Sequence, residues 1–137
     1  MQKIKFLQRI VVCIVILIAV LTPISAVQNS SGPEIDIEIL RGPHFPSPMM
    51  RITNNGNDSA HNVKIIDVEV NGNVLYNNRE SIIEDILEPD SYKIADVNSW
   101  FFGFGLFDIT IYVSCDEGMF ISDTTNGLII GSLILIP

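Results

Sequence analysis

Few residues in this chain of 137 are of types that carry out chemistry. The histidines are His44 and His61, and the cysteines are Cys13 and Cys115. Zinc usually takes three or four nitrogen, sulfur or oxygen ligands, so two histidines without a third ligand do not predict a metal site. The sequence also lacks G-x-S-x-G, a phosphate-binding loop and H-E-x-x-H. We therefore expect no catalytic residue, no metal site and no cofactor, and the protein is not predicted to be an enzyme.

Oxygen-bearing side chains crowd the segment Asn55-Gly56-Asn57-Asp58-Ser59, an arrangement that superficially suggests calcium. The segment lacks the spacing and the distal glutamate of an EF-hand loop, so a plain turn is the favoured interpretation. Asn29 and Asn57 each begin an N-x-[ST] motif, which is the acceptor sequence for N-glycosylation in exported proteins. Glycosylation at either position is a hypothesis.

An aromatic run, Trp100-Phe101-Phe102-Gly103-Phe104-Gly105, is the remaining candidate for a binding patch. Such a run more often belongs to the core, where its glycines let two backbones approach closely. Core packing is therefore the favoured interpretation, and a binding patch is the alternative.

The amino terminus has the three-part layout of a secretory signal peptide. Lys3, Lys5 and Arg9 precede an apolar run over residues 10–21, and small residues follow up to Ala26. This layout predicts removal of residues 1–26 by cleavage between Ala26 and Val27. The apolar run is shorter than the ~20 residues of a spanning helix, which favours cleavage. An uncleaved membrane anchor is the alternative. We expect residues 27–33 to be a flexible lead-in and residues 34–137 to form one domain.

The charge of the chain beyond the leader is strongly acidic. Five of the eight basic residues and all sixteen acidic residues follow residue 26, which gives a net charge of −11. A surface of that sign repels phosphate backbones, so nucleic acid is excluded as a partner. Acidity outside the cell mainly serves solubility.

The cysteines and the chain length limit how the domain can be stabilised. Cys13 lies in the leader, which leaves Cys115 without a partner and excludes a disulfide framework. The remaining 111 residues must fold through hydrophobic burial, and a domain of that size buries roughly 65% of its surface.

The strongest structural pattern is Leu106–Cys115. Phe107, Ile109, Ile111, Val113 and Cys115 alternate with polar residues, which predicts a half-buried strand at the centre of a sheet.

Further strands are predicted before and after it. Three acids on the outer face of Glu34–Leu40 indicate an edge strand, and Asn71-Gly72 gives a hairpin signal. A phase slip at Ile65-Ile66 suggests a bulge or a fully buried stretch, and residues 80–87 fit either helix or strand. The expected strands are Glu34–Leu40, Met49–Thr53, His61–Val70, Asn73–Tyr76, Tyr92–Val97, Leu106–Cys115 and a last strand over Met119–Ser122 and Leu128–Ile136, interrupted at Asp123–Gly127. About seven short strands predict an all-β sandwich.

Three segments resemble a known family. ITNNGNDSAHNVKI, at Ile52–Ile65, resembles the strand-turn-strand of immunoglobulin-like modules of the CARDB or NEW3 kind, in which an I-x-N-x-G turn precedes a-x-N-V. ILEPDSYKI resembles their L-x-P-G-x-S turn, with Asp90 in place of glycine, which favours a type I turn. The tail from Phe102 is similar to the ends of small exported proteins of methanogenic and related archaea. The resemblance, over residues 34–137, implies one immunoglobulin-like domain. Its motifs are turn and strand signals, which say nothing about activity.

Two functional classes follow. The first is an exported module, secreted or at the cell surface, with a structural or adhesive role toward other cell-envelope proteins or glycans. The second is a pilin-like or membrane-anchored subunit that assembles through the amino-terminal apolar segment, which would be its only membrane contact. The mature amino terminus separates them, because cleavage after Ala26 removes the helix that a pilin requires.

Overall fold

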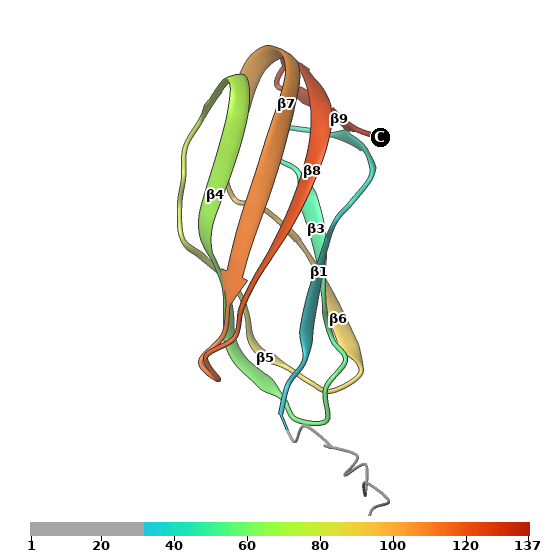
Figure 1. Ribbon diagram of the computed structural model, residues 1–137, viewed down its shortest axis with the longest axis vertical. Helices are drawn as coiled ribbons and strands as arrows, with labels where there is room; N and C mark the ends of the chain where they lie inside the picture. The colour runs from blue at the N-terminus through green and yellow to red at the C-terminus, as the bar shows by residue number, and fades with distance from the viewer. Residues whose placement is uncertain (1–31) are drawn as a thin grey trace, which may run out of the picture.

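The computed structural model describes residues 32–137. The predicted leader at 1–26, its cleavage point at Ala26 and Val27, and the Asn29 sequon lie outside the described residues. Within residues 32–137 the protein is all-β, with nine strands in two sheets (Figure 1). The strands are β1 (Ile35–Ile39), β2 (Gly42–His44), β3 (Met49–Asn54), β4 (Ala60–Tyr76), β5 (Ser81–Leu87), β6 (Ser91–Asp96), β7 (Phe101–Ser114), β8 (Phe120–Gly131) and β9 (Leu133–Ile136).

The larger sheet has six strands in the order β2-β9-β8-β7-β4-β5, and its pairs are antiparallel. β7 lies between β4 and β8 and pairs with both along nearly its whole length. Its residues 107, 109, 111 and 113 are buried, and Cys115 just beyond it is buried too. The prediction of a central strand with this inward face is confirmed.

The smaller sheet has three strands in the order β1-β3-β6. β1 is an edge strand, and its Asp36 and Glu38 face solvent while Ile35, Ile37 and Ile39 are buried. This confirms the prediction of an acidic edge strand. The Pro-rich segment after it contributes only β2, a three-residue strand at an edge of the larger sheet, which suits proline because edge strands tolerate a missing N–H donor.

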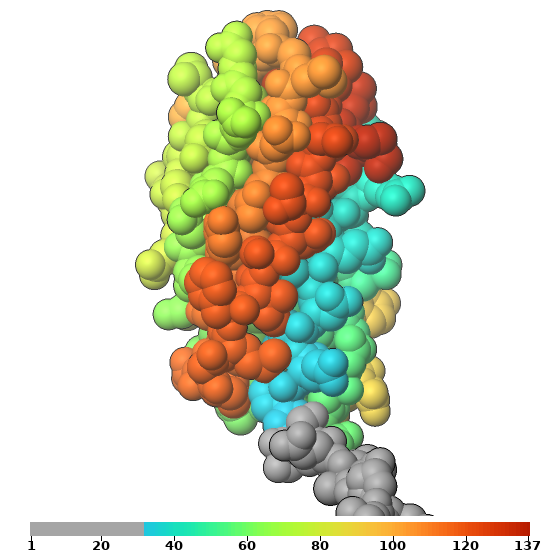
Figure 2. Space-filling view, in the orientation of Figure 1, coloured from blue at the N-terminus to red at the C-terminus, as the bar shows by residue number. Residues whose placement is uncertain are grey.

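One core joins the two sheets. It combines Met50 and Ile52 of β3 with Ile65, Ile109 and Ile111 of the larger sheet, all fully buried. β1 also reaches the other sheet, because the Ile39 backbone N–H donates to Asp123 Oδ2 of β8 at 2.9 Å. Figure 2 shows β1 lying against β8 on the face in view.

The predicted hairpin at Asn71-Gly72 is wrong. β4 continues through both residues to Tyr76, and Asn71 pairs with Asp108 of β7. A type I′ turn requires positive φ at both of its central residues. Gly72 has a positive φ, of 144°, but Asn71 does not. Gly72 lies instead where the register between β4 and β7 shifts, so the backbone freedom of glycine allows a bulge there. The bulge predicted at Ile65-Ile66 is confirmed.

The end of the chain also differs from the prediction. β8 runs without interruption through Asp123–Gly127, because Thr124 and Asn126 take the exposed face of an ordinary alternating strand. The break lies later, at Gly131, whose φ of 65° turns the chain into β9.

Residues 81–87 form strand β5, which resolves the choice between helix and strand. The Pro89-Asp90 turn is not of type I, because Asp90 has a φ of 56°, and positive φ at the third residue belongs to type II.

A single buried amide, that of Asn54, connects the two sheets at one end of the molecule. Its Oδ1 accepts hydrogen bonds from the Glu34 and Gly56 N–H groups at 3.1 and 3.0 Å. Its Nδ2 donates to the carbonyls of Asp58 and Leu87 at 2.8 and 3.0 Å. An amide can make four hydrogen bonds, so Asn54 uses its full capacity.

Gly56 completes this junction. A Cβ at this position would lie 2.4 Å from the Glu34 nitrogen and 2.4 Å from the Gly32 oxygen, which are both backbone atoms. Only glycine therefore lets the turn close against the segment that leads into β1.

We predict that Asn54→Ala lowers the free energy of unfolding by about 2–4 kcal/mol, because it leaves four backbone groups without their partner. Asn55→Ala is the matched control: this neighbouring side chain is exposed, and its loss should cost about 0.5 kcal/mol or less. Urea unfolding of both variants measures the difference. Equal costs would show that the amide does not hold the junction.

A second prediction concerns the two faces of β7. Ile111→Ala removes methylene groups from a fully buried site and should cost about 2–5 kcal/mol. Thr110 lies on the opposite face and bonds Thr124 of β8 at 2.9 Å, so Thr110→Ala should cost less than about 1 kcal/mol. Thermal unfolding of the two variants tests this, and similar losses would mean that the outer face is covered.

Candidate functional site: an apolar surface on the six-stranded sheet

The outward face of β7 changes character along the strand. Phe102, Phe104 and Leu106 point outward near its beginning, whereas Asp108 and Thr110 point outward further on. The strand register places apolar residues of β4, β8, β9 and β2 beside the first three. We call this continuous set the apolar surface; its members are Pro43, Leu75, Phe102, Phe104, Leu106, Leu128, Ile130, Leu133 and Leu135.

The register makes this surface contiguous. Leu75 pairs with Phe102, and the Phe102 and Phe104 rings meet edge to face with centroids 5.7 Å apart. Phe104 pairs with Ile130, which pairs with Leu133. A second row runs across four strands through Leu106, Leu128, Leu135 and Pro43.

The exposed area of this surface is large for a domain of this size. Its six most exposed members are between 40% and 82% exposed, with Leu106 the most exposed. Together they equal about three and a half fully exposed side chains, or roughly 500–700 Å². The largest apolar patch of a typical monomer is roughly 300–600 Å², and patches of this size often mark interaction sites.

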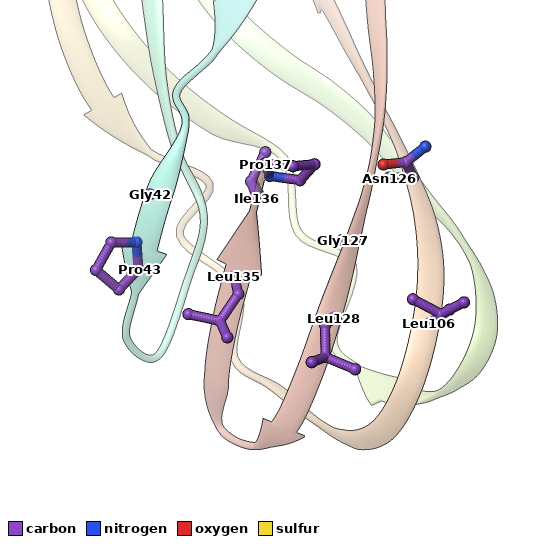
Figure 3. Close-up of a pocket in the computed structure, with 9 residues that line it drawn as sticks. All are labelled: Gly42, Pro43, Leu106, Asn126, Gly127, Leu128, Leu135, Ile136 and Pro137. Atoms are coloured by element: carbon purple, nitrogen blue, oxygen red, sulfur yellow. The ribbon is translucent and has the colours of Figure 1, made fainter.

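A shallow groove of about 440 Å³ lies at one side of the apolar surface (Figure 3). In Figure 3 the side chains of Leu106, Leu128 and Leu135 lie in a row on three neighbouring strands, with Pro43 beyond them. Asn126 is the polar side chain of the lining. The residues that line it are Gly42, Pro43, Leu106, Asn126, Gly127, Leu128, Leu135, Ile136 and Pro137.

At the other side of the surface lie Leu75, Phe102 and Phe104, which we call the ridge. They are 66%, 46% and 58% exposed, and none of them lines the groove. The apolar surface therefore has the ridge on β4 and β7 and a hollowed part that extends over β8, β9 and β2, within one sheet face.

The rest of this sheet face is polar. Thr110 and Thr124 bond across β7 and β8, and the Tyr112 hydroxyl donates to Glu69 Oε2 at 3.0 Å. That hydrogen bond, together with desolvation and the charges of Glu69 and Asp67, raises the pKa of Tyr112 above its ordinary value. The boundary with the apolar surface falls between Leu106 and Asp108.

The aromatic run at residues 100–104 lies mostly on the surface, which corrects the core interpretation. Phe101 is buried and stacks on Tyr76, whereas Trp100, Phe102 and Phe104 are exposed. Gly103 does allow close approach of backbones, because a Cβ there would lie 2.3 Å from the Asn73 oxygen. Alternation along β7 sends only every second side chain inward.

Sequence reasoning missed the partners of these aromatic residues on β4, β8 and β9. A signal was present: apolar residues occupy consecutive positions in LIIG and LILI. In an antiparallel strand such runs place apolar groups on both faces. The sequence predicts a strand for both runs, and the strand period sends every second side chain of each run outward.

The titratable residues singled out in the sequence lie apart from the apolar surface. His44 is buried, and its Nε2 donates to the Leu40 carbonyl at 2.8 Å. His61 stands at the start of β4, where its Nδ1 lies 2.6 Å from Glu117 Oε1. The two histidines therefore have separate structural partners. Within residues 32–137 no group of three or more His, Cys, Asp or Glu side chains is placed to hold a metal ion.

Cys115 is a buried free thiol, as its position on the inward face predicts. Burial and the hydrogen bond to Glu117 raise the pKa of the Cys115 thiol. A protonated thiol is a poor nucleophile, so the neighbouring His61 and Glu117 do not make a nucleophilic cysteine.

Residues 55–59 form a turn around the Asn54 amide, in which Asn55, Asn57 and Asp58 are exposed, consistent with the plain-turn interpretation. Asn57 is exposed there, which leaves its sequon accessible as a candidate. Among the described residues, no helix is long and apolar enough to cross a membrane.

Comparison with known proteins gives no family. No family model matches the chain, and no curated protein matches it. A crystal structure of a Bordetella pertussis protein, assigned provisionally as ApaA, aligns with 11% identity over 78% of this chain and 97% of that one, with a TM-score of 0.40. A likeness of this strength supports no conclusion about fold or function.

The Glu117 carboxylate predicts a pH effect. Desolvation opposes its ionisation, but hydrogen bonds from the His61 ring, the His61 backbone and the Cys115 thiol lower the pKa of Glu117 from 4.5 to about 2. A lowered pKa stabilises the fold above the unfolded value of 4.5, and this contribution disappears as the pH falls toward 2. Glu117→Gln should therefore be less stable than the wild type at pH 6, and the difference should shrink between pH 4.5 and 2. Urea midpoints measure it, and a difference independent of pH would contradict the assignment.

Proposed function

We propose that this protein is an exported immunoglobulin-like module, secreted or held at the cell surface, with a structural or adhesive role. It acts by binding another protein through the apolar surface. The observation that carries this proposal is the chemical contrast between that surface, whose nine residues include no charged side chain, and a chain with a net charge of −11 beyond its leader.

An exposed apolar face costs solubility unless a partner covers it. The face here is built from side chains that the core does not need, since the same strands place Phe107, Ile109 and Ile129 inward. Fully desolvated apolar and aromatic anchors supply most of the binding energy at protein interfaces. Phe102 and Phe104 are exposed aromatic side chains that a partner would desolvate.

The immunoglobulin-like character rests on two sheets around one core and on the turns that resemble those modules. The I-x-N-x-G turn of the resemblance contains Asn54 and Gly56, which close the junction between the sheets. Loops and faces of such scaffolds support binding without any catalytic group.

The orientation of the domain suits presentation outward. Residue 32 lies at one end of the molecule, and the β8–β9 turn beside the apolar surface lies at the other (Figure 1). A domain attached to the cell through residues preceding 32 would hold this surface away from the point of attachment.

Export is tested on intact cells of the producing organism. A membrane-impermeant amine reagent should label the chain at the exposed Lys93, and mass spectrometry should find an amino terminus at Val27 or, for an anchored form, a retained leader. A cytoplasmic protein serves as the unlabelled control. An unprocessed chain that is labelled only after lysis would contradict the proposal.

A further inference from the structure

We propose that the partner covering the apolar surface is a second copy of this chain, in a two-fold symmetric dimer. This inference rests on the proposed function in one respect only, which is that the apolar surface binds protein. Three properties of the surface select a second copy.

The first property is size. The most exposed members offer roughly 500–700 Å² on one chain, and a stable interface buries about 800 Å² per partner. The flanking residues of the groove, such as Leu128, Leu135 and Pro137, add to that area. Two copies placed face to face therefore reach the size at which specific dimers form.

The second property is self-complementary shape. A two-fold interface uses the same patch on both subunits, so each projecting element must meet a hollow elsewhere on that patch. The exposed ridge of Leu75, Phe102 and Phe104 lies at one side, and the groove lined by Leu106, Leu128, Leu135 and Pro43 lies at the other. A two-fold rotation places the ridge of each copy over the groove of the other. The same contact therefore forms twice in one interface.

The third property is the distribution of charge. Four acidic residues, Glu34, Asp58, Glu88 and Glu117, belong to segments near the start of β1 that hydrogen bonds join to the Asn54 turn and to β4. The β8–β9 turn, which belongs to the strands that carry the apolar surface, lies toward the opposite end (Figure 1). None of the nine members of the apolar surface is charged, so pairing through them brings no like charges into direct contact.

Other occupants fit these observations less well. An interfacial lipid site benefits from several basic residues around its apolar part, whereas here Arg41, next to Gly42, is the basic residue adjoining the groove in sequence. A small-molecule pocket usually has several convergent polar groups, and Asn126 is the polar side chain that lines this groove.

Sedimentation velocity of the full chain, as purified from the producing cells, tests the proposal over a range of concentrations. The wild type should pass from monomer to dimer. Leu106→Glu should remain monomeric, since a dimer carries the substitution twice and its dissociation constant should rise about a hundredfold or more. Leu106 is 82% exposed, so the substitution does not disturb the core.

Two further variants make the result specific. Ile82→Glu is the matched control, because Ile82 is 64% exposed on β5, outside the apolar surface, and the substitution adds the same charge. It should dimerise like the wild type. Leu75→Glu, on the ridge, repeats the test independently should Leu106→Glu fail to fold, and it should also remain monomeric.

Several outcomes overturn the dimer. They are a wild type that stays monomeric at every concentration, association that survives in Leu106→Glu, and equal disruption by Ile82→Glu. A monomer that binds anionic phospholipid vesicles, and loses this binding in Leu106→Glu, would assign the surface to lipid instead. A monomeric but exported chain overturns the dimer alone, whereas a dimer confined to the cytoplasm overturns export alone.

Discussion

The Asn54 amide is the interaction on which the arrangement of the two sheets depends. Side-chain burial draws the sheets together without fixing their relative position, because hydrophobic attraction has no direction. Hydrogen bonds do have direction, and the four made by Asn54 fix the lead-in to β1, the turn after β3 and the end of β5 relative to one another. Gly56 is required beside it because the backbones approach too closely for a side chain.

With the sheets held at that end, the long strands β4, β7 and β8 extend to the other end, where β7 curves over the molecule in Figure 1. Their inward side chains fill the core along the whole length. Their outward side chains divide into a polar half, in which Tyr112 and Thr110 bond their neighbours, and an apolar half without charge. Fold stability and interaction thus use opposite faces of the same strands.

Local sequence patterns predicted much of this architecture. Alternation identified the inward face of β7 and the acidic edge strand β1, because period two is a property of a strand regardless of its partners. The I-x-N-x-G pattern marked the Asn54 turn. Local signals failed where a distant partner decided the outcome. Asn71-Gly72 has the residues of a hairpin, yet pairing with β7 kept it extended.

For the candidate site too, some features follow from the sequence and others depend on residues that are distant in the sequence. By itself the sequence determined that residues 27–137 are strongly acidic and that aromatic residues cluster before the central strand. Only the tertiary structure decided that Phe102 and Phe104 face outward and that Ile130 and Leu133 join them. These residues lie up to 31 positions apart in the sequence, and cross-strand register, which depends on long-range pairing, brings them onto one face.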